Sequence, residues 1–464
     1  MRGGRLPEGW VNTEIGDIAE IISGGTPKSG NASNFAPTGE GIAWLTPADL
    51  SGYKKKCIAR GARDLSIDGY SSCSAKLMPA GAILFSSRAP IGYVAVASNE
   101  IATNQGFKSF VFTDEIYPDY AYYYLRNIRH LAEEKGTGTT FKEISGSSAK
   151  TLPFVISPFD EQKIIAEKLD TLLAQVDSTK ASLERVYKKV KMFKLAVMDY
   201  AVKGGLTKEW REKNKVNEWI MTPWENILLD NKNSFRRGPF GGALKKDIFV
   251  EHGYKVYEQY CPINDDCSFS RYYISEEKFN EMRQFEVLAG DFLISGAGSI
   301  GKITLVPEDC EKGIINQALL RVRINHEFYD KKFFLTLFRS PIFQKIIIEN
   351  STGSAMQNLK SVKELKKISV PLPCLSEQHE IVRRVEQLFA YADIIEKQVN
   401  NALARVNNLT QSILAKAFRG ELTEQWRAEN PELISGENSA AALLEKIKAE
   451  RAVSTRKKAS RKKS

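Results

Sequence analysis

The chain has 464 residues, 42% of them hydrophobic and 10% aromatic, which suffices for two to four globular domains with buried cores. Its formal net charge of +10 favours an acidic partner such as nucleic acid, although a basic surface with a basic tail would give the same balance. The six cysteines include no C-x-x-C pair and there are only four histidines, which argues against a zinc site. The sequence has no apolar leader, which argues against secretion, and no run of eighteen apolar residues, which argues against a membrane span. We therefore expect a cytoplasmic chain with reduced cysteines and no metal.

Two segments of similar character are rich in short β-type runs separated by Gly, Pro and Asn. In the first, residues 1–156, a short helix is expected near Tyr120–Glu134, and in the second, residues 217–372, near Lys331–Ile348. The stretches that correspond are 79–96 with 288–305, 101–107 with 313–319, 136–141 with 351–356, and the start "LPEGW" (6–10) with "TPW" (222–224). Both segments are expected to be mixed α/β domains.

A long helix is predicted after each of these segments. Residues 161–211 align with 377–427 without a gap, and 13 of the 51 pairs are identical, which indicates an internal repeat. Apolar residues recur in steps of four and three in the same register, which is typical of helices packed as a coiled coil. Gly204 and Gly420 stand where a helix C-cap belongs, in the phrases "GGLTKEWR" and "GELTEQWR".

Each helix could run for about 40 residues, hence roughly 60 Å. The other copy is the natural partner for each apolar stripe, and packing of each helix on its own domain is the alternative. The expected interface consists of Leu172, Val176, Leu183, Val190, Phe193, Val197, Leu388, Ile395, Val399, Val406, Leu409 and Ile413. The predicted order is domain 1–156, helix and cap 157–216, domain 217–372, helix and cap 373–430, and a tail 431–464 that is helical, then basic and partly disordered.

One motif suggests nucleotide binding, but its surroundings do not fit. The stretch "GAGSIGK" (296–302) contains G-x-G-x-x-G and nearly forms a Walker A loop. Ile303 stands where a Ser or Thr would ligate Mg²⁺, and the stretch "KITLVP" (302–307) favours a strand rather than a helix. A Gly-rich loop between two strands explains the motif. Motifs for adenosylmethionine binding, for nucleases and for Ser/His/Asp catalysis are absent from the sequence, so no catalytic residue is expected.

The remaining chemistry is DNA readout, which uses Arg, Lys, Asn, Gln, Ser and Thr on loops. Individually, such residues are more often ordinary surface groups. The candidate DNA-binding residues are Thr26, Lys28, Lys54, Lys55, Ser87, Arg88, Thr137, Thr139, Thr140 and Lys142 in the first domain, and Arg236, Arg237, Lys245, Lys246, Ser295, Ser299, Thr352, Ser354, Gln357 and Asn358 in the second.

The repeated helical segments, "EQKIIAEKLDTLLAQVDSTKA" with "GGLTKEWR" and "EQHEIVRRVEQLFAYAD" with "GELTEQWR", resemble those of the specificity subunits of type I restriction–modification systems. The similarity covers the whole chain and is greatest to the enteric family A group. It implies an α+β chain with two target recognition domains, separated by two long antiparallel coiled-coil helices that are related by a pseudo-two-fold axis. Each domain would read half of a split, asymmetric sequence in double-stranded DNA.

The resemblance also implies partners that carry the catalysis. Two modification subunits would supply S-adenosylmethionine and adenine-N6 methylation, and two restriction subunits would supply ATP- and Mg²⁺-dependent translocation and cleavage. This chain would bind none of these cofactors. Two alternatives remain at this point: a coiled-coil assembly scaffold whose domains bind proteins, and a tandem DNA-binding regulator without restriction partners.

Overall fold

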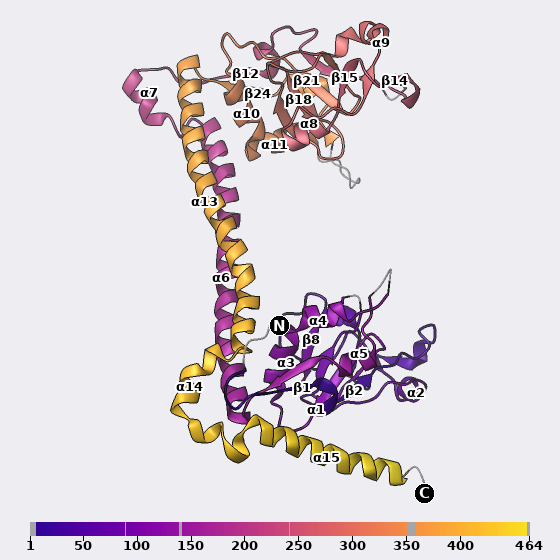
Figure 1. Cartoon of the computed structure of the whole chain (residues 1–464). Helices are drawn as coiled ribbons and strands as arrows, with labels where there is room; N and C mark the ends of the chain where they lie inside the picture. Colours follow the sequence, from indigo (N-terminus) through magenta and orange to yellow (C-terminus); the bar gives the residue numbers. More distant parts are fainter. Residues whose placement is uncertain (1–5, 89, 139–141, 241, 350–357, 462–464) are drawn as a thin grey trace. The chain divides into compact units, whose positions relative to one another are not determined.

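The computed structural model describes residues 6–88, 90–138, 142–240, 242–349 and 358–461 (Figure 1). The chain forms two compact units, one of residues 1–182 with 402–464 and one of residues 183–401. Each unit joins a mixed α/β domain to part of each long helix, which confirms the predicted fold class. No helix in the described part of the chain is long and apolar enough to cross a membrane.

The domain of the first unit is built on the antiparallel pair β1–β11 and a sheet in the order β2-β10-β7-β8-β5. Its elements are β1 (Val11–Glu14), α1 (Ile15–Ile18), β2 (Ala19–Ser23), η1 (Ala32–Asn34), β3 (Phe35–Ala36), β4 (Trp44–Leu45), η2 (Pro47–Leu50), β5 (Cys57–Ile58), β6 (Asp64–Leu65), α2 (Ile67–Ser71), β7 (Ile83–Phe85), β8 (Val94–Ala97), β9 (Ala102–Thr103), β10 (Lys108–Phe112), α3 (Pro118–Asn127), α4 (Arg129–Glu134), α5 (Gly146–Lys150) and β11 (Pro153–Ile156).

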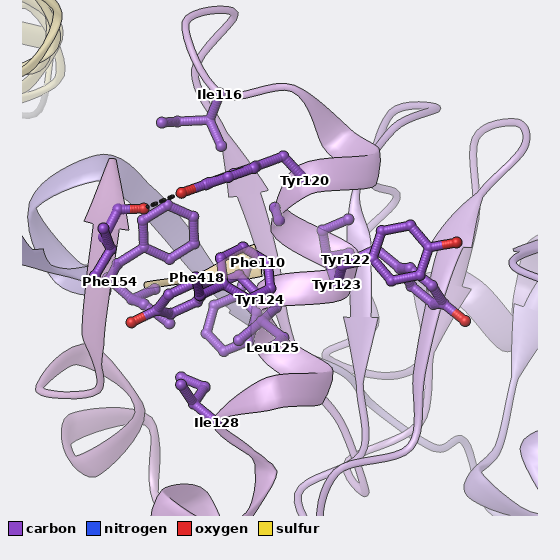
Figure 2. Packing of buried hydrophobic residues seen from close by; sticks show 14 of the residues in the cluster. Phe110, Ile116, Tyr120, Tyr122, Tyr123, Tyr124, Leu125, Ile128, Phe154 and Phe418 are labelled. Atoms are coloured by element: carbon purple, nitrogen blue, oxygen red, sulfur yellow. Dashed lines mark hydrogen bonds between the residues drawn. The ribbon is translucent and has the colours of Figure 1, made fainter. Parts of the chain in front are cut away.

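The core of this unit contains a cluster of aromatic rings from α3, β11 and the residue that follows the second long helix (Figure 2). The Phe418 ring lies 5.3 Å from that of Tyr120 and 5.0 Å from that of Tyr124, both edge-on. The Phe154 ring lies 4.5 Å from Tyr124. The Tyr120 side chain can be buried without leaving its hydroxyl unsatisfied, because that hydroxyl donates to the Val155 carbonyl at 2.8 Å. The end of a distant helix is thus part of the domain core.

The domain of the second unit has the sheet orders β13-β21-β18-β19 and β14-β16-β15-β20-β17, beside the antiparallel pair β12–β24. Its elements are β12 (Ile220–Pro223), η3 (Trp224–Ile227), β13 (Phe235–Arg237), η4 (Lys246–Ile248), β14 (Phe249–Val250), β15 (Tyr254–Tyr257), α8 (Tyr260–Asn264), β16 (Tyr273–Ile274), α9 (Glu276–Glu281), η5 (Arg283–Phe285), β17 (Glu286–Val287), β18 (Phe292–Ser295), β19 (Ile303–Leu305), β20 (Gly313–Ile315), β21 (Leu319–Val322), α10 (Lys331–Arg339), α11 (Pro341–Ile347), β22 (Ile348–Glu349), β23 (Asn358–Leu359), α12 (Val362–Lys366) and β24 (Ser369–Leu372).

The two domains share the strand order β2-β10-β7-β8 and β13-β21-β18-β19. The short helix expected in each domain is a pair of consecutive helices, α3 with α4 and α10 with α11, interrupted at Ile128 and at Ser340. The second interruption has a clear local cause, because Pro341 follows it and the side chain of Ser340 caps the next helix.

The sequence alignment of the two domain starts is wrong. Val11 pairs with Ile156 in the first domain as Ile220 pairs with Leu372 in the second, so the residue before each strand corresponds: Trp10 and Trp219. Trp224, which the match of "LPEGW" to "TPW" selects, instead lies in the core with no exposed surface. An alignment that matches tryptophan to tryptophan by residue type selects the wrong one, and the strand register identifies the equivalent residue.

The long helices α6 (Phe159–Val202) and α13 (Leu375–Ala417) are continuous over 44 and 43 residues. In the first unit the start of α6 shares a core with the end of α13, and in the second unit the end of α6 shares a core with the start of α13. The helices are therefore antiparallel. In the second unit, Lys194 Nζ also pairs with Asp393 at 2.5 Å and Glu396 at 2.9 Å.

The predicted apolar stripes are buried along their centres and exposed at their edges. Val176, Val190, Val197, Val399 and Val406 are buried, whereas Leu172, Leu183, Leu388, Ile395 and Ile413 are half-buried. Phe193 and Leu409 are 41% and 44% exposed, so the buried seam is narrower than the predicted interface.

Both helices end at a glycine in the left-handed region, Gly204 at φ 76° and Gly420 at φ 78°, as expected for C-caps. The segments that follow α6 and α13 are α7 (Lys208–Asn214), η6 (Glu421–Thr423), α14 (Glu424–Glu429), η7 (Pro431–Leu433), η8 (Gly436–Asn438) and α15 (Ala440–Arg461). The predicted boundaries of the five segments of the chain stay predictions.

Candidate nucleic-acid interface

A buried carboxylate joins the start of α6 to the cap that follows α13. Glu161 has no exposed surface, and its Oε1 accepts hydrogen bonds of 2.6 Å from Thr423 Oγ1 and from Arg427 Nη1. Its Oε2 accepts a third, also of 2.6 Å, from Trp10 Nε1. Because a buried charge is tolerated only when it is paired and hydrogen-bonded, this cluster fixes the cap at residues 420–427 against the first domain and its helix.

The second unit repeats this junction with one bond fewer. Glu377 Oε1 accepts 2.6 Å hydrogen bonds from Thr207 Oγ1 and Arg211 Nη1. Glu377 Oε2 and Trp219 Nε1 are both buried and have no hydrogen-bond partner among the described residues, although the Trp219 ring lies 5.4 Å from the Arg211 guanidinium. Each repeated phrase therefore anchors the glutamate at the start of the other long helix.

The neighbouring glutamines attach each helix to the backbone of its domain. Gln162 Nε2 donates to the carbonyls of Glu115 and Ser157, and its Oε1 accepts from the Tyr117 N–H. In the second unit, Gln378 makes the corresponding three bonds, to Phe328 O, Pro373 O and Asp330 N. The Glu-Gln pairs thus hold each domain at a fixed place on the helices.

The loop between β7 and β8 presents the most distinctive feature of the first domain. Arg88 is 40% exposed at the side chain and pairs with Glu143 at 3.7 Å. It borders an open hollow of about 480 Å³ that is lined by Thr46, Pro47, Ala48, Ser51, Arg88, Tyr93 and Asn104. A hollow that combines a cation, an amide, hydroxyls and an aromatic ring suits a nucleic-acid backbone or base edge.

Serines at matched positions shape the corresponding hairpins from inside. Ser86 Oγ accepts from Tyr93 N at 2.8 Å and donates to Pro90 O at 2.7 Å. In the second domain, Ser295 Oγ accepts from Lys302 N at 3.0 Å and donates to Ser299 O. The hairpin 296–302 therefore joins two strands, β18 and β19, and supplies no helix N-terminus for a phosphate.

An Asn-Gln pair occupies the same loop in both domains, between β9 and β10 and between β20 and β21. Asn104 Oδ1 accepts from Gly106 N at 2.9 Å, and Asn316 Oδ1 accepts from Ala318 N at 3.1 Å. Each asparagine shapes its turn, and the next residue, Gln105 or Gln317, is exposed. The sequence comparison of the two domains aligns these pairs, but the predicted DNA-binding residues do not include the two glutamines.

A glycine lies against each of these loops, at a distance that admits no side chain. A Cβ at Gly24 would lie 2.1 Å from the Asn104 carbonyl oxygen, and one at Gly238 would lie 1.8 Å from that of Asn316. The matched loops after β2 and β13 are thus held against the Asn-Gln loops. Thr26, which donates to Gln105 Oε1, follows the first glycine, and Phe240, 93% exposed, follows the second.

The predicted candidates divide by their surroundings. Those on exposed surface are Lys28, Lys54, Lys55, Thr137, Lys142, Arg237, Lys245, Lys246, Ser299 and Asn358. Thr26, Arg88 and Arg236 are half-buried and bonded to protein groups. Ser87 and Ser295 have no exposed surface, so the structure places them inside the loops rather than on them. Thr139, Thr140, Thr352, Ser354 and Gln357 lie outside the described residues.

One lysine next to the candidates has a structural partner. Lys56 Nζ pairs with Asp119 at 2.5 Å and with Asp170 of α6 at 2.8 Å. Burial works to lower the pKa of Lys56, but the two carboxylates raise it above its usual value. This lysine therefore fastens the domain to α6, whereas Lys54 and Lys55 point to solvent. Across the described residues, no group of three or more His, Cys, Asp or Glu is arranged to hold a metal ion.

The family described as "Type I restriction modification DNA specificity domain" matches residues 7–188 and 241–405. The specificity subunit of the type I restriction enzyme EcoKI from Escherichia coli K12 is 37% identical over the full length of both chains. That of EcoBI from Escherichia coli is 49% identical over 70% of each chain.

Solved structures show the same fold. A chain from a study titled "Structural basis underlying complex assembly and conformational transition of the type I R-M system" matches with a TM-score of 0.66 and 16% identity, over 90% of this chain and 100% of that one. The HsdS subunit of Thermoanaerobacter tengcongensis matches with a TM-score of 0.55 and 16% identity, over 90% of this chain and 99% of that one.

Proposed function

The chain belongs to the family of type I restriction–modification specificity subunits, and from this premise we propose that its two domains read the two halves of one split, asymmetric DNA sequence. The observation that carries this proposal is the combination of a shared frame with different loops. The two domains share the order of four strands, a glycine against an Asn-Gln loop, and a glutamate that accepts from the Thr and Arg of the other helix's cap. At matched loop positions, however, the residues differ: the first domain has Thr26 where the second has Phe240, and Arg88 where the second has Ala297. Equal frames with unequal contacts would read unequal half-sites.

The long helices are proposed to set the distance between the half-sites. Forty-four helical residues correspond to about 66 Å at 1.5 Å per residue. Each end is fixed to a domain through a buried glutamate and a glutamine bonded to the domain backbone. Such a support favours half-sites about one turn of DNA apart, roughly 34 Å. A change in helix length should then alter the spacer and leave both half-sites unchanged.

Catalysis is proposed to belong to partner subunits. Two modification subunits would bring S-adenosylmethionine and methylate adenine N6, and two restriction subunits would bring ATP and Mg²⁺ for translocation and cleavage. A target adenine would be flipped into a modification subunit, since base chemistry requires removal of the base from the stack. Exposed apolar residues on the helices offer docking surface for the modification subunits: Met192 (68%), Tyr200 (57%), Tyr391 (63%) and Ile394 (56%).

The test is the pattern of DNA methylation in cells that express this chain with its modification subunit. The proposal predicts N6-methyladenine within a bipartite asymmetric motif with a fixed, unspecified spacer. The same cells with the modification subunit alone are the control and should show no such motif. Methylation of a continuous palindrome, or none that depends on this chain, would reject the proposal and favour a scaffold or a regulator.

A further inference from the structure

One aromatic side chain of the second domain lies almost entirely in water. Phe240 is 93% exposed, and the next most exposed large apolar side chain in the described part of the chain, Ile67, is 77% exposed. A phenyl ring in water forgoes the favourable free energy that burial of its surface would bring, so this ring gains from contact with a partner.

The backbone that carries Phe240 is fixed to the domain. The two residues between β13 and Phe240, Gly238 and Pro239, are buried. Gly238 N donates to the Leu319 carbonyl at 2.9 Å, and a Cβ at Gly238 would lie 1.8 Å from the Asn316 carbonyl oxygen. The ring of Pro239 restricts φ of the next residue along. The chain therefore passes from buried backbone to a projecting ring within one residue.

Phe240 lies at the end of the sheet where three loops of the second domain meet. Strand β21 pairs antiparallel with β13 and with β18, so the start of β21 lies beside the ends of the other two strands. The loop before β21 carries the exposed Gln317, and Gly296 of the loop after β18 donates to the Ala318 carbonyl at 2.8 Å. The ring therefore belongs to the same end of the domain as the exposed glutamine of the Asn-Gln loop.

The charges near Phe240 in the sequence favour DNA over a protein as the partner. Arg236 and Arg237 precede it, Lys245 and Lys246 follow it, and all but Arg236 are exposed. The buried centre of a protein–protein interface is depleted of charged residues. Aromatic rings among positive side chains are instead typical of surfaces that bind nucleic acids.

The first domain has no such ring at the matched position. Thr26 follows Gly24 as Phe240 follows Gly238, but Thr26 is half-buried and donates to Gln105 Oε1 of its own domain. The two domains therefore differ in shape where their frames agree, and the contact that Phe240 makes is confined to one of them.

We propose that Phe240 inserts between two neighbouring base pairs of the half-site read by the second domain. This proposal rests on the proposed function, since it takes the second domain as a reader of duplex DNA. Insertion covers both faces of the ring, whereas contact with a thymine methyl group would cover one. Partial unstacking is easiest at pyrimidine–purine steps, so Phe240 would favour a deformable step without forming a hydrogen bond to it.

The test uses the complex of the full chain with its modification subunits, bound to a duplex that carries the methylated motif found in cells. Energy transfer between dyes at the two duplex ends measures the bend. 2-Aminopurine, whose fluorescence rises when it leaves the base stack, replaces each adenine in turn except the methylated ones. Unspecified base pairs that adjoin a half-site are made A·T so that they also accept this probe.

The variants are Phe240→Ala, which removes the ring, and Phe240→Trp, which keeps an aromatic ring. Leu229→Ala is the matched control, because Leu229 is also an exposed apolar residue of this domain, at 63%. It lies at the opposite end of the sheet, where its N–H donates to the Arg323 carbonyl beyond the end of β21.

Insertion of a side chain kinks a duplex by about 20–90°, so Phe240→Ala should bend the duplex less than the wild type by an angle in that range. It should also lose a 2-aminopurine signal within or beside the second half-site. Affinity for the motif should fall about 5- to 150-fold, as expected when a ring that stacks on a base is removed. Phe240→Trp should retain the bend, and Leu229→Ala should match the wild type. Unstacking of the target adenines is common to all variants and cancels in these comparisons.

An unchanged bend in Phe240→Ala would overturn the insertion, as would a signal that depends on Phe240 in the first half-site. Replacement of thymine by uracil that reproduces the affinity loss without a change in bend would indicate a methyl contact instead. Loss of a partner subunit from the Phe240→Ala complex, with the bend unchanged, would indicate a protein contact. A wild type that binds the motif no better than an unrelated duplex would reject the proposed function itself.

Discussion

The two glutamate junctions differ by one hydrogen bond, and this difference predicts unequal effects of the same substitution. Glu161 Oε2 accepts a 2.6 Å hydrogen bond from Trp10 Nε1, whereas Glu377 Oε2 has no donor within the part of the chain that the structure describes. In Glu161→Gln, one amide position becomes a donor. Either it opposes the Trp10 N–H or it opposes the Thr423 and Arg427 donors, and a buried donor stays unsatisfied. In Glu377→Gln the amide NH₂ can occupy the Oε2 position, which forms no hydrogen bond with the described residues in the wild type, so no existing hydrogen bond is lost.

Both substitutions remove a charge from a buried ion pair, so that cost is common to the two. Glu161→Gln additionally breaks an existing hydrogen bond and sets buried donors against each other, which costs about 1–3 kcal/mol. It should therefore lower the free energy of unfolding by about that much more than Glu377→Gln. The assay is urea unfolding of the full chain, followed by tryptophan fluorescence. Glu421→Gln is the control, because Glu421 pairs with Arg419 on the surface, with side chains 45% and 56% exposed, and should show no measurable change. Equal losses for Glu161→Gln and Glu377→Gln, or a larger loss for Glu377→Gln, would refute this reasoning.

The other predictions concern DNA readout and the attachment of α15. Gln105→Ala should weaken recognition of the first half-site only, and Gln317→Ala the second only, by about 1–3 kcal/mol for a residue that contacts a base; binding-site selection measures this, and an equal effect on both halves would contradict it. Arg88→Ala should weaken DNA binding by a similar amount, whereas Lys56→Ala should lower stability instead; the two are separated by titration of DNA and thermal unfolding of the same variants. Gly24→Ala should displace the Asn104 loop, since its Cβ would lie 2.1 Å from that carbonyl oxygen, and Gly30→Ala, with nothing within 4 Å, is the matched control. Burial works to raise the pKa of Glu115, but the ion pair with Lys446 lowers it below its usual value. This ion pair therefore stabilises the attachment of α15 at pH values above the pKa of Glu115 in the unfolded chain, about 4.3. The stabilisation is lost as the pH falls through the lower pKa of the folded chain. As the pH falls through these two pKa values, the rate of hydrogen exchange in α15, corrected for the intrinsic rate, should rise in the wild type and rise much less in Glu115→Gln.

Periodicity and caps make much of the architecture predictable from sequence. Steps of four and three predict the two long helices, and Gly204 and Gly420 predict their ends, because helix period and the left-handed cap are local properties. The gap-free repeat predicts the duplicated plan. Partners across the chain are not predictable in the same way. The repeated "EQ" and "LT..WR" phrases are visible in the sequence, but their pairing depends on the antiparallel arrangement, which brings Glu161 to Arg427.

The candidate site was less predictable, for two physical reasons. First, residue type does not reveal burial: Ser295 looks like a loop serine but holds its hairpin from inside, while Lys56 belongs to an ion pair with α6. Second, strand register decides which residues match: the pairing of β12 with β24 identifies Trp219 as the counterpart of Trp10, which residue identity alone misassigns. The aligned "NQ" stretches do carry a signal for Gln105 and Gln317 as candidate DNA-binding residues. Each asparagine makes a turn, and a turn of this kind exposes the glutamine that follows it.

The central claim is that each domain reads its own half-site within one chain. Its most direct test replaces residues 1–155 with the corresponding domain of a family member that has a different target, and then maps N6-methyladenine in cells that also express the modification subunit. We expect a new bipartite motif in which one half is changed, while the other half and the spacer length are retained. A motif changed in both halves, or one with the original halves intact, would contradict it.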